Sequence, residues 1–263
     1  MAETKTAVAN VPIWLDLSSS DPAGSREFYS KLFGWQVDVN PDPQYGGYAL
    51  GKLGGKDVAG IGPKQSPEGP SAWLVYIGTK NADETVKKTT AAGGRVIVEP
   101  MQVGPQGRMV VIQDPAGAFL GAWEPGEMKG AGVMNAPNSF GWSELNARGI
   151  DKSIDFYKKV FGWSVKKSEM GGQSGMPEYN EFQVNGESIA GGMEMGSMIP
   201  AEVPSYWMPY FEVADVDKAF KKATDLGASE MVAPQDFPGG RFSIVSDPQG
   251  ATFGLLKTAP RQK

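Results

Sequence analysis

Hydrophobic and polar residues alternate along residues 12–19, PIWLDLSS. Ile13, Leu15 and Leu17 fall on one side of an extended chain, and Trp14, Asp16 and Ser18 fall on the other. A period of two is typical of a strand that buries one face and leaves the other for a different environment. The segment therefore predicts a half-buried strand.

The hydrophobic period then changes to that of a helix. Asp21 and Pro22 are suited to the N-cap and the first helical position. Phe28 and Leu32 lie four residues apart and give the helix an apolar side. Gly34 is where we expect this helix to end.

The same order of patterns returns along the chain. A helix is predicted from Asn81 to Gly93, and another around residues 150–161. The most regular helical spacing is that of residues 216–226. Strands are predicted at 48–53, 58–62, 73–78, 96–100, 108–113, 118–123, 140–146, 178–184, 188–194, 207–213, 241–246 and 251–257.

One nine-residue stretch is written twice. Residues 27–35 read EFYSKLFGW and residues 155–163 read DFYKKVFGW, 128 residues later. The offset is about half of the 263-residue chain, which indicates a duplicated domain rather than an array of short repeats.

We therefore predict an α+β chain of four βαβββ modules, two in each of two domains. The expected parts are a flexible N-terminus (1–10), a first domain (11–125), a linker (126–138) and a second domain (139–258). The sequence leaves open whether the modules pair in chain order or exchange between the halves.

Composition narrows the functional classes. The net charge of −5 and the lack of basic runs argue against a nucleic-acid partner. No apolar run has the length of a membrane span and the first residues lack a signal-peptide pattern. We expect a cytoplasmic protein with no membrane partner, with export without a signal peptide as the alternative.

The chain contains no histidine and no cysteine. Histidine is the commonest metal ligand and the usual general base near neutral pH. The usual zinc sites and a serine–histidine–acid triad are therefore excluded.

The repeated FYxxxFGW segment, together with DPAG (114–117) and DPQG (247–250), resembles the vicinal oxygen chelate family. This family contains glyoxalases, bleomycin-binding resistance proteins and extradiol dioxygenases. The tandem layout is similar to that of actinobacterial glyoxalase-like proteins, among them a secreted antigen. The resemblance implies that paired modules form an open barrel, in which the enzymes bind a divalent metal through His, Gln or Glu.

The positions that the resemblance assigns to metal ligands hold other residues here: Trp14, Leu74 and Gly121 in the first domain, and Trp142, Met208 and Gly254 in the second. None of these side chains holds a hard divalent ion. We therefore expect no metal and no cofactor, with glycine leaving room where a ligand side chain stood.

Strand parity places further side chains on the same face as these positions, and so inside each barrel. Asp16 and Glu144 are the candidate catalytic acids or bases, since burial raises the pKa of a carboxyl group. Arg108 and Arg241 are candidate partners for these carboxylates, but each lies six residues before a DPxG aspartate, and this equal spacing favours a shared structural role. The candidate ligand-binding residues are Trp14, Tyr76, Trp123, Trp142, Met208 and Tyr210.

Three functions follow from this pattern. The first is a metal-free binding protein for a small molecule, an aromatic metabolite or antibiotic, held among these aromatic side chains. The second is a metal-independent isomerase, lyase or hydrolase that uses Asp16 and Glu144. The third is a scaffold in which Trp14 and Trp142 only fill the barrels.

Overall fold

The computed structural model describes residues 9–64, 68–169, 178–197 and 199–259. The first half contains helices α1 (Pro22–Phe33) and α2 (Ala82–Ala91), the short 3-10 helix η1 (Pro43–Tyr45), and strands β1 (Pro12–Ser19), β2 (Gln36–Val39), β3 (Ala49–Leu53), β4 (Lys56–Pro63), β5 (Ala72–Gly78), β6 (Arg95–Val103), β7 (Gly107–Gln113) and β8 (Phe119–Pro125).

The second half repeats this order. It contains helices α3 (Ile150–Phe161) and α4 (Val216–Asp225), and strands β9 (Ser139–Ala147), β10 (Ser164–Lys167), β11 (Tyr179–Val184), β12 (Glu187–Glu194), β13 (Tyr206–Glu212), β14 (Ser229–Phe237), β15 (Gly240–Ser246) and β16 (Thr252–Thr258). None of the helices in the described residues is long and apolar enough to span a membrane.

Each half forms one mixed eight-stranded sheet. The strand orders are β2-β3-β4-β1-β5-β8-β7-β6 and β10-β11-β12-β9-β13-β16-β15-β14. The modules therefore pair in chain order, with β1 against β5 and β9 against β13. Both sheets remain open between their edge strands, which confirms the predicted α+β fold of paired βαβββ modules.

The first strand and helix form where the sequence predicts them. The Asp21 side chain accepts a hydrogen bond from the backbone N–H of Gly24, and Gly34 ends α1 with a left-handed φ of 73°. Strands β2, β10 and β14 were not predicted. β2 and β10 have only four residues each and bury little of their surface, and no residue of β14 is fully buried. A register shift between Pro12 and Trp14 moves Ile13 away from Leu15 and Leu17, so it packs with Trp14 instead.

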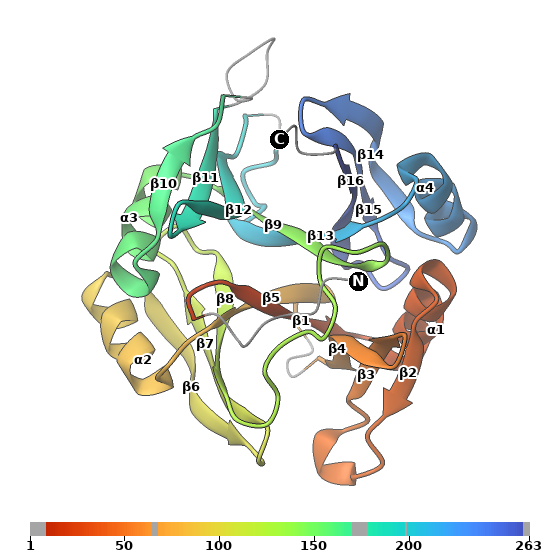
Figure 1. The fold of residues 1–263 in the computed structure, drawn as a ribbon, viewed down its shortest axis with the longest axis horizontal. Helices are drawn as coiled ribbons and strands as arrows, with labels where there is room; N and C mark the ends of the chain where they lie inside the picture. The colour runs from red at the N-terminus through yellow and green to blue at the C-terminus, as the bar shows by residue number, and fades with distance from the viewer. Residues whose placement is uncertain (1–8, 65–67, 170–177, 198, 260–263) are drawn as a thin grey trace.

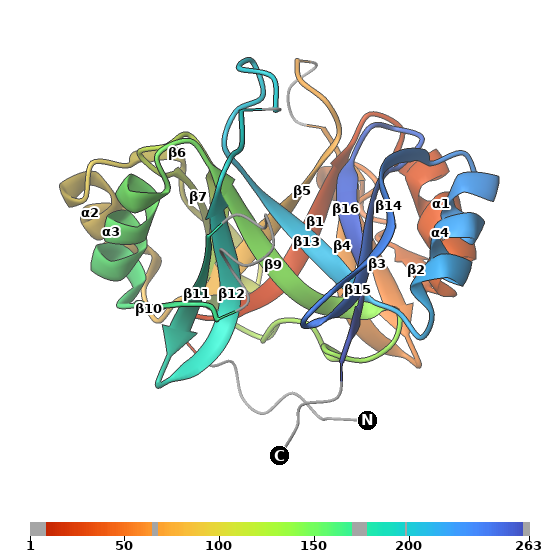
Figure 2. The same ribbon diagram turned by 90° about the horizontal axis from the view of Figure 1, so that it is seen from above.

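The two sheets lie back to back, and helices from different halves stand side by side. Figures 1 and 2 show α1 beside α4 at one side of the molecule and α2 beside α3 at the other. The main hydrophobic core draws on both halves, with Tyr29 and Phe33 of α1 packed around Phe253 of β16. The two halves therefore bury one shared core.

The repeated motifs join the two halves. The Tyr29 hydroxyl donates to Asp247 Oδ2 at 2.8 Å and accepts from Trp73 Nε1 at 3.0 Å. The other half mirrors this, as the Tyr157 hydroxyl donates to Asp114 Oδ2 at 3.0 Å. Each helix tyrosine thus uses the DPxG aspartate of the opposite domain, which gives the FYxxxFGW and DPxG motifs a structural role.

Candidate functional site

Each sheet has an inner face, the face that points away from the shared core and the helices. All six predicted ligand-binding side chains lie in two small clusters outside the main core, one on each inner face. The first cluster contains Trp14, Tyr76 and Trp123, and the second contains Met208 and Tyr210 with Trp142 packed against them.

In the first domain the inner face is organised around one carboxyl group. Asp16 Oδ1 accepts hydrogen bonds from Trp14 Nε1 at 3.0 Å and from the Tyr48 hydroxyl at 2.6 Å. The Tyr76 hydroxyl is a further donor to this carboxyl group. Three aromatic donors thus converge on Asp16, from β1, from the residue just before β3 and from β5.

The second domain repeats this arrangement around Glu144. Its Oε1 accepts from Asn146 Nδ2 at 3.2 Å and from the Tyr210 hydroxyl at 3.2 Å. The Tyr179 hydroxyl is a further donor to the carboxyl group and itself accepts from Trp142 Nε1 at 2.9 Å. The longer Glu144 side chain accepts a hydrogen bond from Asn146, two residues later on β9. Asp16 instead accepts one from the indole of Trp14, two residues earlier on β1.

Burial controls the protonation of both sites. Loss of water raises the pKa of Asp16 and of Glu144, and the tyrosine, tryptophan and asparagine donors only partly oppose this effect. The pKa of Tyr76 and of Tyr210 rises well above the ordinary tyrosine value, first by burial and then by the adjacent carboxylate. Each site therefore combines a carboxyl group that can keep its proton with tyrosines that stay neutral donors.

The glycines on neighbouring strands are not empty ligand positions, which corrects the expectation from the sequence. A Cβ on Gly121 would lie 2.4 Å from Tyr76 Cδ1, and one on Gly254 would lie 2.0 Å from Tyr210 Cδ1. A Cβ on Gly60 would lie 1.9 Å from the Tyr48 hydroxyl oxygen. The tyrosine rings fill the space above these glycines and are thereby held against the carboxyl groups.

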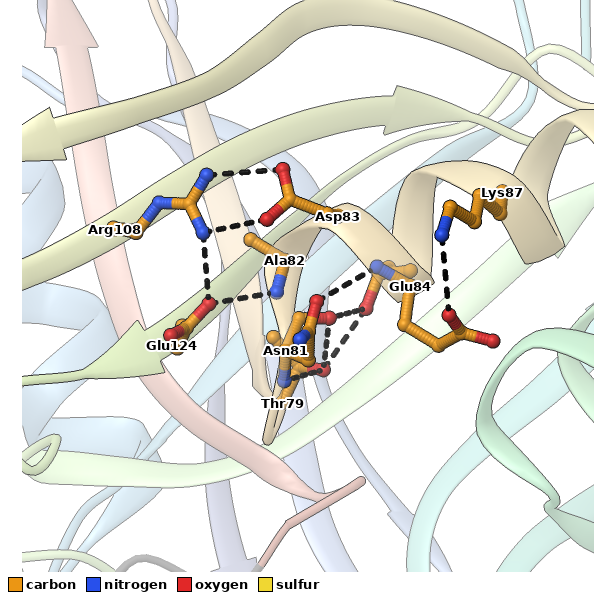
Figure 3. A network of polar contacts seen from close by, with 9 residues as sticks. Thr79, Asn81, Ala82, Asp83, Glu84, Lys87, Arg108 and Glu124 are labelled. Atoms are coloured by element: carbon orange, nitrogen blue, oxygen red, sulfur yellow. Dashed lines mark hydrogen bonds and ion pairs between the residues drawn. The ribbon is translucent and has the colours of Figure 1, made fainter.

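The two arginines do not reach the inner carboxyl groups, and they have the structural role that the sequence favoured. Arg108 binds both carboxylate oxygens of Asp83, at 2.8 and 3.0 Å, and Glu124 at 3.4 Å (Figure 3). Glu124 also accepts from the backbone N–H of Ala82 at 2.8 Å. Arg241 holds Asp217 in the same way at the start of α4. Both arginines fix a helix start to a strand.

Sequence reasoning missed Tyr48, Tyr179 and Asn146. Strand parity alone was enough to find Asn146, which follows Glu144 by two residues on the same strand. The two tyrosines lie two strands away from the carboxyl groups in each sheet. The only sign of each tyrosine in the sequence was a glycine on the adjacent strand. Gly60 makes room for Tyr48, and Gly191 makes room for Tyr179.

The two inner faces differ in whether the tryptophan or the carboxyl group is the more exposed. In the first domain Trp14 is only 3% exposed while Asp16 is partly exposed. In the second domain Glu144 is 7% exposed while Trp142 is partly exposed. Beside Glu144, Asn146 of β9 lies opposite Tyr206 of β13 in the antiparallel pairing of these strands. The equivalent pair in the first domain is Ser18 opposite Ala72, and both of these side chains are smaller.

The sequence matches the glyoxalase/bleomycin resistance protein/dioxygenase superfamily over residues 13–120 and 139–255. It is 37% identical to the "Putative glyoxylase CFP32" of Mycobacterium tuberculosis, over 95% of this chain and 96% of that protein. It is also 37% identical to the anthracycline biosynthesis protein DnrV of Streptomyces peucetius, over 94% of this chain and 92% of that protein.

Solved structures share the fold at low identity. The Mn(II)-bound glyoxalase of Novosphingobium aromaticivorans aligns with a TM-score of 0.64 at 16% identity, over 97% of this chain and 86% of that one. The 2,3-dioxygenase LapB of Pseudomonas sp. KL28 aligns with a TM-score of 0.67 at 12% identity, over 98% and 95% of the two chains.

The inner faces do not fit the divalent metal that enzymes of this fold bind. Within the described residues, no group of three or more His, Cys, Asp or Glu side chains is placed to hold an ion. Asp16 and Glu144 are each met by O–H and N–H donors, and these stabilise an anion rather than a cation. The donor set is that of a hydrogen-bonding site.

Proposed function

Because the chain belongs to the glyoxalase/bleomycin resistance protein/dioxygenase superfamily, we propose that it is a metal-free binding protein for an aromatic or partly apolar small molecule. The observation that carries the proposal is the inner face itself. The carboxyl group at its centre is surrounded by tyrosine and tryptophan side chains, and the described residues contain no group of three or more His, Cys, Asp or Glu side chains that could hold a metal ion.

These side chains favour a ligand with a flat apolar body and a hydroxyl group. Aromatic rings bind flat apolar groups through stacked and edge contacts. The Asn146 amide and the Tyr210 hydroxyl both donate to Glu144 Oε1, and the same carboxyl group offers a hydrogen-bonding partner for a ligand hydroxyl. The name of the Streptomyces relative, an anthracycline biosynthesis protein, supports hydroxylated polycyclic aromatics as the first compounds to test.

The test is a binding screen with protein that has been treated with EDTA and dialysed. Hydroxyanthraquinones, simple phenols and non-aromatic hydroxy acids are compared by thermal shift and by tryptophan fluorescence. We expect saturable binding of hydroxylated aromatics that is unchanged by EDTA. Binding that appears only after Mn²⁺, Ni²⁺ or Zn²⁺ is added contradicts the proposal, and binding of no compound leaves the scaffold role.

A metal-independent enzyme is the second candidate, and the raised pKa values of Asp16 and Glu144 favour it. A carboxyl group that stays protonated closer to neutral pH is a suitable general acid. In this case Asp16→Asn or Glu144→Gln removes turnover of a bound compound while the compound still binds. Turnover that persists in the double variant excludes both residues from the chemistry.

A further inference from the structure

We infer that the aromatic ligand binds only in the second domain, at the end of the inner face marked by Trp142 and Phe242. The chain's own connecting segment, residues 126–134, occupies the equivalent end of the first domain. This inference rests on the proposed function and adds to it which site is used, how many ligands bind, and which ligand chemistry the site accepts.

The connecting segment is packed onto the first inner face. In Figure 1 the yellow-green chain between β8 and β9 loops across the inner side of the first sheet. Met128, Ala131 and Met134 pack with the cluster that contains Trp14 and Trp123. The Trp123 indole Nε1 also donates to the Met128 carbonyl oxygen at 2.9 Å. Apolar side chains of the protein thus cover the aromatic end of the first site.

The backbone holds this segment in place. The Ala131 N–H donates to the Ile13 carbonyl at 2.8 Å, and the Gly132 N–H donates to the Asp57 carbonyl at 2.7 Å. Gly130 has a φ of 115°, and a Cβ there would lie 2.9 Å from the Ile13 oxygen. A larger residue at Gly130 would push the segment away from Ile13. The two backbone hydrogen bonds and this close contact make residues 126–134 a fixed cover of the first inner face.

The second inner face has no such cover in the described chain, where its cluster consists of residues from the sheet's own strands. Phe242 makes edge-to-face contacts with Tyr210 at 6.4 Å and with Phe237 at 5.7 Å between ring centroids. Trp142, Phe237 and Phe242 are all partly exposed. They form an aromatic surface on β9, β14 and β15 that a flat molecule can cover.

The chemistry of the two ends of this site defines the ligand class. Glu144 lies two residues beyond Trp142 on β9, on the same face, so a ligand against the aromatic surface is close to its carboxyl group. The surrounding groups at the far end are neutral donors, Asn146 and Tyr210. We therefore expect an uncharged planar aromatic that carries a hydroxyl group at one end.

The experiment uses 2-hydroxyanthraquinone and the full chain. Phe242 and Met109 hold equivalent positions, since each pairs with the residue two positions beyond the glycine of the last strand: Leu256 in one domain and Trp123 in the other. Both are partly exposed. We expect Phe242→Ala to weaken binding at least about tenfold, while Met109→Ala changes it by less than about twofold.

Isothermal titration calorimetry gives the stoichiometry, which we expect to be one molecule per chain. Quenching of tryptophan fluorescence by the ligand should largely disappear in Trp142→Phe and persist in Trp14→Phe. Circular dichroism checks the fold of each variant, and Phe242→Leu, which keeps most of the apolar volume, should bind more tightly than Phe242→Ala.

The outcomes separate this inference from the proposed function. Two molecules per chain, or a larger loss in Met109→Ala than in Phe242→Ala, overturns the inference but leaves a binding protein. Equal quenching losses in the two tryptophan variants also overturn it. Failure of 2-hydroxyanthraquinone and of every other hydroxylated aromatic to bind overturns both.

Discussion

The two inner faces begin from the same plan and end as different sites. Each holds a carboxyl group on its first strand, a tyrosine beside a glycine, and a tryptophan two residues before the acid. The first face covers its tryptophan with the connecting segment and leaves Asp16 partly exposed. The second face buries Glu144 and leaves Trp142 partly exposed.

The difference shows that equivalent positions in a repeat need not have equivalent access. The strands place Trp14 and Trp142 alike, but the chain that follows β8 continues across the inner face. Exposure therefore depends on the connection, which is not part of the repeated unit.

Truncation of the two tryptophans should separate the two faces most clearly. Trp14 is 3% exposed and donates to Asp16, so Trp14→Ala should lower the free energy of unfolding by about 3–5 kcal/mol. Trp142 is partly exposed, so Trp142→Ala should cost about half as much. Urea unfolding measures both. Equal losses would show that the connecting segment adds no burial at Trp14.

A methyl group under each tyrosine should be almost as damaging. Gly254→Ala and Gly121→Ala force the Tyr210 and Tyr76 rings off their strands, and overpacking of this kind costs about 1–3 kcal/mol. Thermal unfolding checks the size of the loss. Combining Gly254→Ala with Tyr210→Ala should recover part of it, and no recovery would place the strain elsewhere.

The two inner carboxyl groups, Asp16 and Glu144, should make stability depend on pH. The pKa of Asp16 and of Glu144 is raised on folding, so their contribution to stability is full below the unfolded pKa and is lost as pH rises through the folded pKa. Each unit of difference between the folded and unfolded pKa corresponds to about 1.4 kcal/mol.

Replacing these groups should therefore flatten the pH profile. Unfolding free energies measured between acidic and neutral pH should fall less in Glu144→Gln and in Asp16→Asn than in the unchanged protein. A stability that instead rises with pH because of these residues would contradict the raised pKa. The comparison of the two variants shows which carboxyl group is the more strongly shifted.

The smallest effects should come from the arginines that brace the helix starts. Arg108 and Arg241 bind exposed aspartates, and water and salt weaken such pairs. Arg108→Ala and Arg241→Ala should shift the unfolding midpoint by similar, small amounts that shrink further at high salt. A large loss from one arginine alone would show that the two helix starts are not equivalent.

The sequence predicted correctly those elements whose boundaries depend on neighbouring residues. Asp21, Pro22 and Gly34 mark the ends of α1 because capping depends on adjacent residues. The FYxxxFGW repeat predicted the duplication, and strand parity predicted which face carries Asp16 and Glu144. The shift at Ile13 escaped prediction because it depends on how β1 pairs with β5.

The site was predicted only in part. The donor Tyr48 directly precedes β3 and Tyr179 begins β11, and alternation along β1 and β9 contains no information about them. The glycines were correctly singled out but misread, because their effect is visible only once the tyrosine rings are placed above them. The role of residues 126–134 depends on where a segment without periodicity packs, and its pattern predicted only a linker.

The reciprocal tyrosine–aspartate pairs also affect how the chain folds as it is synthesised. Tyr29 is translated early, but its acceptor Asp247 follows 218 residues later. Until β15 and β16 emerge from the ribosome, the aromatic side of α1 lacks the ring of Phe253 that covers it. The core of the first half therefore stays incomplete during most of translation. Because these contacts join residues so distant in sequence, we expect the docking of β15 and β16 against α1 to be slow.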